Sequence, residues 1–288
     1  MTAPKTHTLD APGATITYDV REAETGDAPV LLLIGSPMTA DGFTTLAGYF
    51  PDRTVVTYDP RSAGRSKRTD GAKETTPDEH ADDLRRVIEA VGGGPVDVFA
   101  TSGGAINTMA LVAAHPDLLR TLVAHEPPTA QLLPDREQAL AAIENIRDTY
   151  QADGLGPAMA KFITLVMHKG PVPADFGQRS VDPSNFGLPT QDDGTRDDPL
   201  VGQNIITCTH YRPDFDALRS ASTHVVVAIG EESEDEMAYR GGLAVAERLG
   251  TEAVIFPSHH GGFMGAEAGP MAGKPEEFAA KLREVLPK

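Results

Sequence analysis

The feature that most restricts the fold is an apolar, strand-like segment that leads into a helix through a turn of small residues around one serine. Residues 96–105 read VDVFATSGGA, so Ser102 has Ala100 two positions before it and Gly104 two positions after it. Small residues are needed there when strand and helix backbones nearly touch, as in a nucleophile elbow with the usual pattern G-x-S-x-G. Ala100 replaces the first glycine of that pattern. The segment predicts either a nucleophilic serine raised above a sheet or an ordinary strand-to-helix turn.

Strand-like and helix-like segments alternate on both sides of this turn. The helix-like segments include one with a capping box, Thr76 and Glu79, and with Pro77 at its first position. The strand-like segments cover residues 14–20, 30–34, 54–58, 96–100, 121–124, 224–230 and 253–256, and the helix-like ones residues 77–91, 103–115, 240–249 and 275–286. This order predicts an α/β fold, with a parallel sheet and helices on both of its faces.

The alternation stops between residues 129 and 221, where no convincing strand is found. Apolar residues repeat at helical spacing over residues 140–150 and 159–167, and a stretch rich in Pro, Asp and Gly follows over residues 171–199. The apolar face of residues 159–167 indicates core packing, with the lining of a substrate pocket as the alternative. We therefore predict a core formed by residues 1–128 and 222–288, with a helical cap inserted at 129–221.

Charge and composition exclude several classes of partner. A formal net charge of −17 and a pI near 4.8 argue against binding to nucleic acid or to an anionic membrane. The one basic cluster, at Arg61, Arg65, Lys67 and Arg68, is expected to be a solvated loop. We expect the main partner to be a small-molecule substrate and leave homo-oligomer formation open.

The same composition indicates a cytoplasmic protein. The single cysteine, Cys208, allows no intrachain disulfide and suits a reducing compartment. The polar first 13 residues lack the apolar stretch of a signal peptide, and the apolar run at residues 30–34 is too short to cross a bilayer.

Four landmarks occur in a fixed order along the chain. They are the sequence IGSP at residues 34–37, DPRSAGRS at residues 59–66, the turn around Ser102, and PSHHGGF at residues 257–263. Together with the interrupted alternation they resemble the α/β-hydrolase superfamily with a cap domain, over nearly the whole chain. The resemblance implies the α/β-hydrolase fold, with a mostly parallel eight-stranded sheet, helices on both faces and an inserted helical cap.

A serine hydroxyl needs a histidine to take its proton and a carboxylate to orient that histidine. The resemblance places the histidine in the loop after the last strand, where His259 and His260 are candidates. The spacing from Pro257 and to Gly262-Phe263 favours His260 as the base of Ser102. His259 is then expected to be a neighbour at the rim of the site.

The position of the acid departs from the common pattern. In most of the superfamily an aspartate lies three residues beyond a glycine after the next-to-last strand, and this position is Ser233 here. The acidic run 231–236 could supply a substitute, although such a run is more typical of a solvated turn. Glu126 lies at the end of the strand that follows the elbow, a placement that resembles the zearalenone lactonase branch. The expected catalytic residues are Ser102, His260 and Glu126, with the 231–236 loop as the alternative source of the acid.

The resemblance also implies an oxyanion hole formed by the backbone N–H groups of Ser36 and Gly103, since Pro37 has no N–H to offer. Cys208 and His210 lack further ligands at metal-binding spacing, so we assign no metal. No G-x-G-x-x-G or P-loop pattern is found, so no nucleotide and no other cofactor is implied.

The leading hypothesis is a cofactor-independent serine hydrolase of the carboxylesterase or lactonase type. It would cleave an ester or lactone of a small, largely apolar substrate through an acyl-enzyme. A serine at the elbow, rather than an aspartate, argues against haloalkane dehalogenase and epoxide hydrolase chemistry. The alternatives left open are a carbon–carbon bond hydrolase, a haloperoxidase-like enzyme, and a ligand-binding receptor on the same fold.

Overall fold

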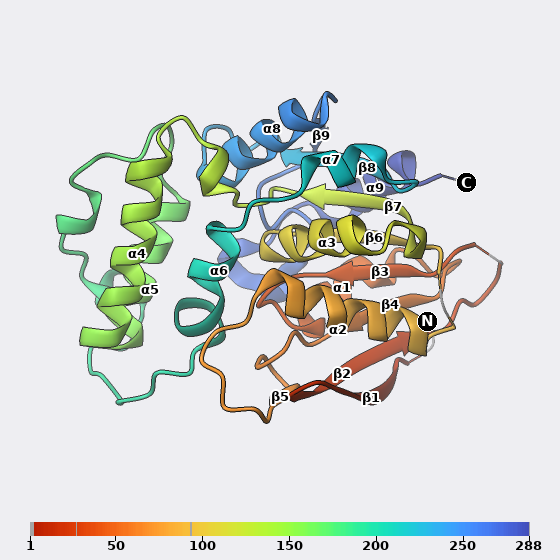
Figure 1. Ribbon diagram of the computed structural model, residues 1–288, viewed down its shortest axis with the longest axis horizontal. Coiled ribbons are helices and arrows are strands. Elements are labelled where there is room, and N and C mark those ends of the chain that lie inside the picture. The colour runs from red at the N-terminus through yellow and green to blue at the C-terminus, as the bar shows by residue number, and fades with distance from the viewer. Residues whose placement is uncertain (1–2, 27, 93, 288) are drawn as a thin grey trace.

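The computed structural model describes residues 3–26, 28–92 and 94–287, and its centre is one twisted β-sheet (Figure 1). The strands follow the order β1-β2-β4-β3-β6-β7-β8-β9 across the sheet, and the two-residue β5 pairs with β2. Their bounds are β1 Lys5–Ala11, β2 Ala14–Arg21, β3 Leu31–Ile34, β4 Val55–Tyr58, β5 Lys67–Arg68, β6 Val96–Thr101, β7 Leu119–His125, β8 His224–Gly230 and β9 Val254–Phe256.

From β4 to β9 every neighbouring pair of strands is parallel, whereas β2 runs antiparallel to both β1 and β4. The central strand β3 pairs with β4 on one side and with β6 on the other, and its four residues are all buried. The carboxyl ends of β3, β6 and β7 therefore lie at one edge of the sheet. The sheet confirms the predicted mostly parallel architecture.

Helices cover both faces of the sheet, because successive side chains of a strand point to opposite faces. Leu32 and Ile34 pack in one apolar cluster with residues of α2, α3 and α8, whereas Leu31 and Leu33 pack in a second cluster with residues of α1 and α9. These helices span α1 Thr44–Gly48, α2 Pro77–Ala90, α3 Gly103–Ala114, α8 Met237–Leu249 and α9 Pro275–Val285. The predicted arrangement of helices on both faces is confirmed.

Residues 129–221, which we call the helical segment, contain no β-strand. Their main helices are α4 Arg136–Asp153, α5 Leu155–Val166, the π-helix η6 Pro199–Asn204, α6 Ile205–Thr209 and α7 Phe215–Ser220. In Figure 1, α4 and α5 stand to the left of the strands, and they share a third apolar cluster. The helix α7 lies instead against α3 and α8. The cap boundaries 129 and 221 stay a prediction.

Two features differ from the sequence interpretation. The polar N-terminal residues form the strand β1, which pairs with β2 from Lys5 to Ala11. The basic cluster is only in part the solvated loop that the sequence predicts. Lys67 is exposed, but Arg61 is 2% exposed and binds Asp83 through two hydrogen bonds, of 3.0 and 2.6 Å. Arg65 and Arg68 also bind carboxylates, so these arginines neutralise acidic neighbours instead of forming a free positive patch.

No helix in the described parts of the chain is both long enough and apolar enough to cross a bilayer.

Candidate active site

The turn between β6 and α3 has the geometry of a nucleophile elbow. Ser102 has φ 54° and ψ −130°, a backbone conformation that L-residues rarely adopt, and α3 begins at the next residue. The strand-end turn is held by a 2.9 Å hydrogen bond from the Ser102 N–H to the carbonyl of His125. A Cβ atom on Gly104 would lie 2.9 Å from the carbonyl oxygen of Ile34. This close approach is the physical reason for a glycine two positions after the serine.

His260 and Glu126 meet at the same edge of the sheet. The Nδ1 atom of His260 lies 2.6 Å from Oε2 of Glu126, and the other carboxylate oxygen accepts a 2.8 Å hydrogen bond from the Gly230 N–H. Glu126 is fully buried, whereas the His260 side chain is 35% exposed. With Nδ1 donating to the carboxylate, Nε2 of His260 is the ring nitrogen left to accept a proton.

Charges in this pair stabilise one another. Burial by itself raises the pKa of Glu126, but the hydrogen bond with His260 and the nearby imidazoles outweigh it and hold this pKa at about 2. Burial lowers the pKa of His260, but its hydrogen bond with Glu126 and the carboxylate charge outweigh that effect and raise the pKa above its usual value. Glu126 is therefore ionised at neutral pH, as an orienting carboxylate must be.

His259 lies beside this pair but bonds elsewhere. Its Nδ1 accepts a 3.0 Å hydrogen bond from the Gly261 N–H, and its Nε2 lies 3.3 Å from the carbonyl oxygen of Ala272. Both of its ring nitrogens are thus used by the loop backbone.

The usual acid position, Ser233, is completely buried, and its hydroxyl has no hydrogen-bond partner among the described residues. A Cβ atom on Gly230 would lie 3.0 Å from Oγ of Ser233 and 3.2 Å from Oε1 of Glu126. The two acid positions weighed from the sequence therefore converge on the same place beside Gly230. In the rest of the acidic run, Glu231 and Glu232 are exposed and bind Lys274.

The two predicted oxyanion-hole residues are neighbours. A Cβ atom on Gly103 would lie 2.7 Å from the carbonyl oxygen of Ser36, so β3 and α3 meet closely here. Gly103 is the first residue of α3, and the first N–H groups of a helix have no partner within it. Cys208 packs against this junction, with Sγ 3.8 Å from the carbonyl oxygen of Gly103.

A cavity of about 140 Å³ connects these groups. Ser102, His260 and Ser36 line it together with mainly apolar side chains, which include Pro37, Met38, Phe162, Leu200, Phe263, Met264 and Met271. Among the described residues of this lining, His260 is the only one with a titratable side chain. The cavity thus brings a serine and a carboxylate-paired imidazole next to a largely apolar space, and Ser36 but not Gly103 is among its lining residues.

Comparison with known proteins identifies the family of this fold. The sequence profile of the alpha/beta hydrolase fold family matches residues 28–233, which is more than half of the chain. The chain belongs to the α/β-hydrolase fold family. This hydrolase is 30% identical to the uncharacterized hydrolase YraK of Bacillus subtilis (strain 168), over 98% of this chain and 96% of that protein.

Solved structures with the same fold include two enzymes of different named activity. A thermophilic esterase from Thermogutta terrifontis aligns with a TM-score of 0.65 and 18% identity, over 98% of this chain and 97% of that one. A putative non-heme bromoperoxidase, BpoC, from Mycobacterium tuberculosis aligns with a TM-score of 0.64 and 18% identity, over 93% of this chain and 94% of that one. At such identities the likeness shows the fold of the hydrolase alone.

Two contributions of the helical segment to the cavity of the hydrolase were not resolved by the sequence. Phe162 lies on the apolar face of residues 159–167 and lines the cavity. In the same helix, Leu165 is buried in the core, whereas Met167, just after the end of α5, is 65% exposed. Leu200 reaches the cavity from the π-helix η6, in a region that the sequence marks only as irregular. A π-helix often marks a functional site, but no sequence pattern identifies one.

A partly buried ion pair links the helical segment of the hydrolase to its core. Arg240 of α8 binds Asp135, at the start of α4, and also donates a 2.7 Å hydrogen bond to the carbonyl of Gly170. Asp135 in turn accepts a 2.7 Å hydrogen bond from the Val172 N–H. Because the chain just after α5 is held in this way, the position of Phe162 depends on the same contacts.

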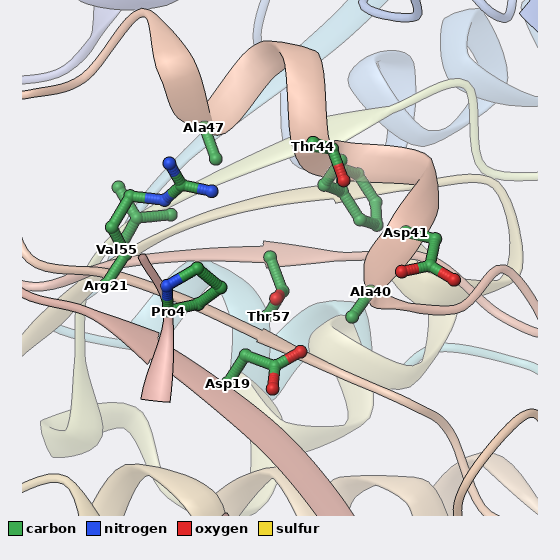
Figure 2. Close-up of a pocket in the computed structure, with 10 residues that line it drawn as sticks. Pro4, Asp19, Arg21, Ala40, Asp41, Thr44, Ala47, Val55 and Thr57 are labelled. Atoms are coloured by element: carbon green, nitrogen blue, oxygen red, sulfur yellow. The ribbon is translucent and has the colours of Figure 1, made fainter. Parts of the chain in front are cut away.

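Figure 2 shows a second cavity of about 180 Å³, between β2, β4 and α1. Its polar lining comes from Asp19, Arg21 and Asp41, together with two threonines, and the described residues that line it include no serine, cysteine or histidine. This second cavity of the hydrolase therefore lacks the nucleophile and base that acyl transfer requires.

Proposed function

We propose that this hydrolase is a cofactor-independent serine esterase or lactonase that acts on small, largely apolar substrates through an acyl-enzyme. The observation that carries the proposal is the 2.6 Å contact between buried Glu126 and His260, beside a cavity that Ser102 also lines. A serine next to an imidazole oriented by a carboxylate is the arrangement that activates a hydroxyl nucleophile.

In the proposed reaction the Ser102 Oγ attacks the carbonyl carbon of the ester while Nε2 of His260 takes the hydroxyl proton. The tetrahedral oxyanion accepts hydrogen bonds from the N–H groups of Ser36 and Gly103. Collapse of this intermediate breaks the bond to the alcohol, and the imidazolium gives its proton to the leaving oxygen. Water then attacks the acyl-enzyme by the same steps, which releases the carboxylic acid and restores Ser102. Glu126 keeps the ring of His260 in place and stabilises its positive charge.

The lining of the cavity supports the proposed substrate class. Its side chains are mainly apolar, and a volume of about 140 Å³ is below the range of pockets that enclose drug-sized ligands. We therefore infer a short, uncharged acyl group. The position of Glu126 at the end of β7 supports a relationship with the zearalenone lactonase branch, so lactones belong in the first substrate panel.

The test is steady-state hydrolysis of p-nitrophenyl esters from acetate to octanoate and of small lactones. We expect multiple turnovers, with kcat/KM highest for the short acyl chains. A fluorophosphonate should add one adduct to the wild-type protein and to Ser222→Ala, which changes an exposed serine, but none to Ser102→Ala. An adduct that persists in Ser102→Ala would refute the nucleophile. Tight binding with at most one turnover would support a receptor instead.

A further inference from the structure

His125, the last residue of β7, has a buried nitrogen that the proposed reaction does not use. The side chain is completely buried against the aromatic rings of Phe99, Phe256 and Phe278. Its Nδ1 lies 3.0 Å from Oγ1 of Thr101, while its Nε2 has no partner among the described residues. An unpaired buried nitrogen costs free energy, so it calls for a physical explanation.

His125 belongs to a compact group of side chains that can act as metal ligands. Each of His125, Glu126 and His260 offers one ligand atom, and these three atoms lie within 4.8 Å of one another. The two imidazole rings are nearly parallel, with an interplanar angle of 25° and centroids 5.9 Å apart. Since Nδ1 of His125 faces Thr101, Nε2 is the atom that this ring has available for a ligand.

We propose that His125, Glu126 and His260 form an inhibitory site for a divalent transition metal ion such as Zn²⁺. Two imidazole nitrogens and one carboxylate are a ligand set that suits zinc, with a fourth position left for water. Histidine ligands usually hydrogen-bond through their second nitrogen, as His125 does with Thr101. Ca²⁺ and Mg²⁺ prefer oxygen ligands and should not bind here.

Binding requires only a small rearrangement. Zinc–ligand bonds of about 2.1 Å place tetrahedral ligand atoms about 3.4 Å apart. The group must therefore contract from separations of at most 4.8 Å, while the 2.6 Å contact between Glu126 and His260 opens to admit the ion. The exposed side of His260 offers the way in, because Glu126 is fully buried.

Loss of activity follows from the position of the ring proton. A metal ion on Nδ1 of His260 displaces the proton that Nδ1 donates to Glu126, and this proton moves to Nε2, so that the number of protons on the ring is unchanged. Nε2 then has no lone pair with which to accept the proton of Ser102. This inhibition rests on the proposed function, whereas the binding of the ion does not.

Binding is tested by calorimetric titration with Zn²⁺ and by the visible absorption of Co²⁺, using the wild-type protein and Ser102→Ala. We expect both proteins to bind one ion through these ligands. Loss of a group that only supports a ligand costs about 10- to 100-fold in affinity, so loss of the ligand in His125→Gln or His125→Phe should cost about 100-fold or more. The matched control is His210→Gln, which changes a histidine that lies 3.3 Å from a surface carboxylate, Glu144.

Two variants of His125 keep the test informative if one fails to fold. Gln keeps a polar group for Thr101, and Phe fits the aromatic surroundings. Equal affinity of the wild-type protein and a folded His125 variant would overturn the inference, as would a loss of binding in His210→Gln alone.

The inhibitory effect is measured as the ratio of esterase rates with and without Zn²⁺, within each variant. We expect this ratio to fall in the wild-type protein and in His210→Gln, and to stay near one in the His125 variants. Mg²⁺ at the same concentration should leave it unchanged. Zinc inhibition that is equally strong in the His125 variants refutes the metal site while the esterase proposal stands. Absence of any esterase rate, with cobalt absorption that depends on His125, refutes the esterase proposal alone.

Discussion

Mild acid should destabilise this protein through its buried histidines, His80 of α2 and His125, because burial lowers the pKa of each to about 4. His80 is 1% exposed, its Nε2 lies 2.8 Å from Oδ1 of Asn204, and its Nδ1 has no partner among the described residues. Burial lowers the pKa of His80 from 6.5 to about 4. Asn204 is the last residue of η6, the element that also carries Leu200 of the active-site cavity.

The sign and size follow from linkage. Between pH 6.5 and 4 the unfolded chain binds a proton at His80 and the folded chain does not, so the free energy of unfolding falls as the pH falls. Each unit of pH costs about 1.4 kcal/mol, which gives about 2 kcal/mol at pH 5 and about 3 kcal/mol below pH 4. Carboxylates also titrate in this range, so the contribution of His80 must be measured as a difference between variants.

The assay is urea unfolding at pH 7, 6 and 5, followed by far-ultraviolet circular dichroism because the chain has no tryptophan. His80→Gln keeps an amide that can bond Asn204 but cannot be protonated. Between pH 7 and pH 5 we expect its free energy of unfolding to fall by about 2 kcal/mol less than that of the wild-type protein. His115→Gln, which changes an exposed histidine, should follow the wild-type protein. An equal fall in the free energy of unfolding of the wild-type protein and His80→Gln would refute the contribution of His80.

Three further predictions concern the site. His260→Ala should lower kcat by about 10⁴ or more, whereas His259→Ala should cost about tenfold, and the reverse order in a kinetic assay would exchange their roles. The acid limb of kcat/KM should lie above pH 6.5, because Glu126 raises the pKa of the base that must be neutral. Glu126→Gln should move this limb to lower pH and reduce kcat by about 10²–10⁴. The control Glu232→Gln should leave both the pH profile and kcat unchanged. Arg240→Met should raise KM for esters more than it changes kcat, because α5 is released. The control is Arg179→Met, which breaks an exposed ion pair. Equal KM values for Arg240→Met and Arg179→Met would show that Arg240 does not help to position α5.

The sequence predicted those parts of the fold in which burial leaves a pattern. Strand β3 is apolar because both of its faces are covered, and α2 begins at Pro77 with Thr76 as its N-cap, as the capping box predicts. Strand β1 leaves no such pattern, since most of its residues are exposed and it is held by backbone pairing with β2. Arg61 was misread for a related reason: its partner Asp83 lies on α2, 22 residues further along the chain.

The candidate site divides in the same way. The elbow around Ser102 is local and was visible in the sequence, whereas the contact of Glu126 with His260 joins residues 134 positions apart and could be expected only from the family resemblance. Nothing local marks the unpaired Nε2 of His125 or the arrival of Leu200 from η6. Such features depend on how distant segments pack, and they become visible only in the folded chain.

The backbone at Ser102 has a consequence for how the protein can be handled. With φ at 54°, the Cβ atom of residue 102 is strained, at a cost of about 1–3 kcal/mol that the fold pays in every molecule. Ser102→Gly and Ser102→Ala both remove the hydroxyl, but only glycine relieves this strain. The glycine variant should therefore melt at a higher temperature than the alanine variant. It would be the more stable inactive form in which to capture an intact substrate. The difference in the free energy of unfolding between the two variants would measure the strain that comes with holding the hydroxyl of residue 102 above the sheet.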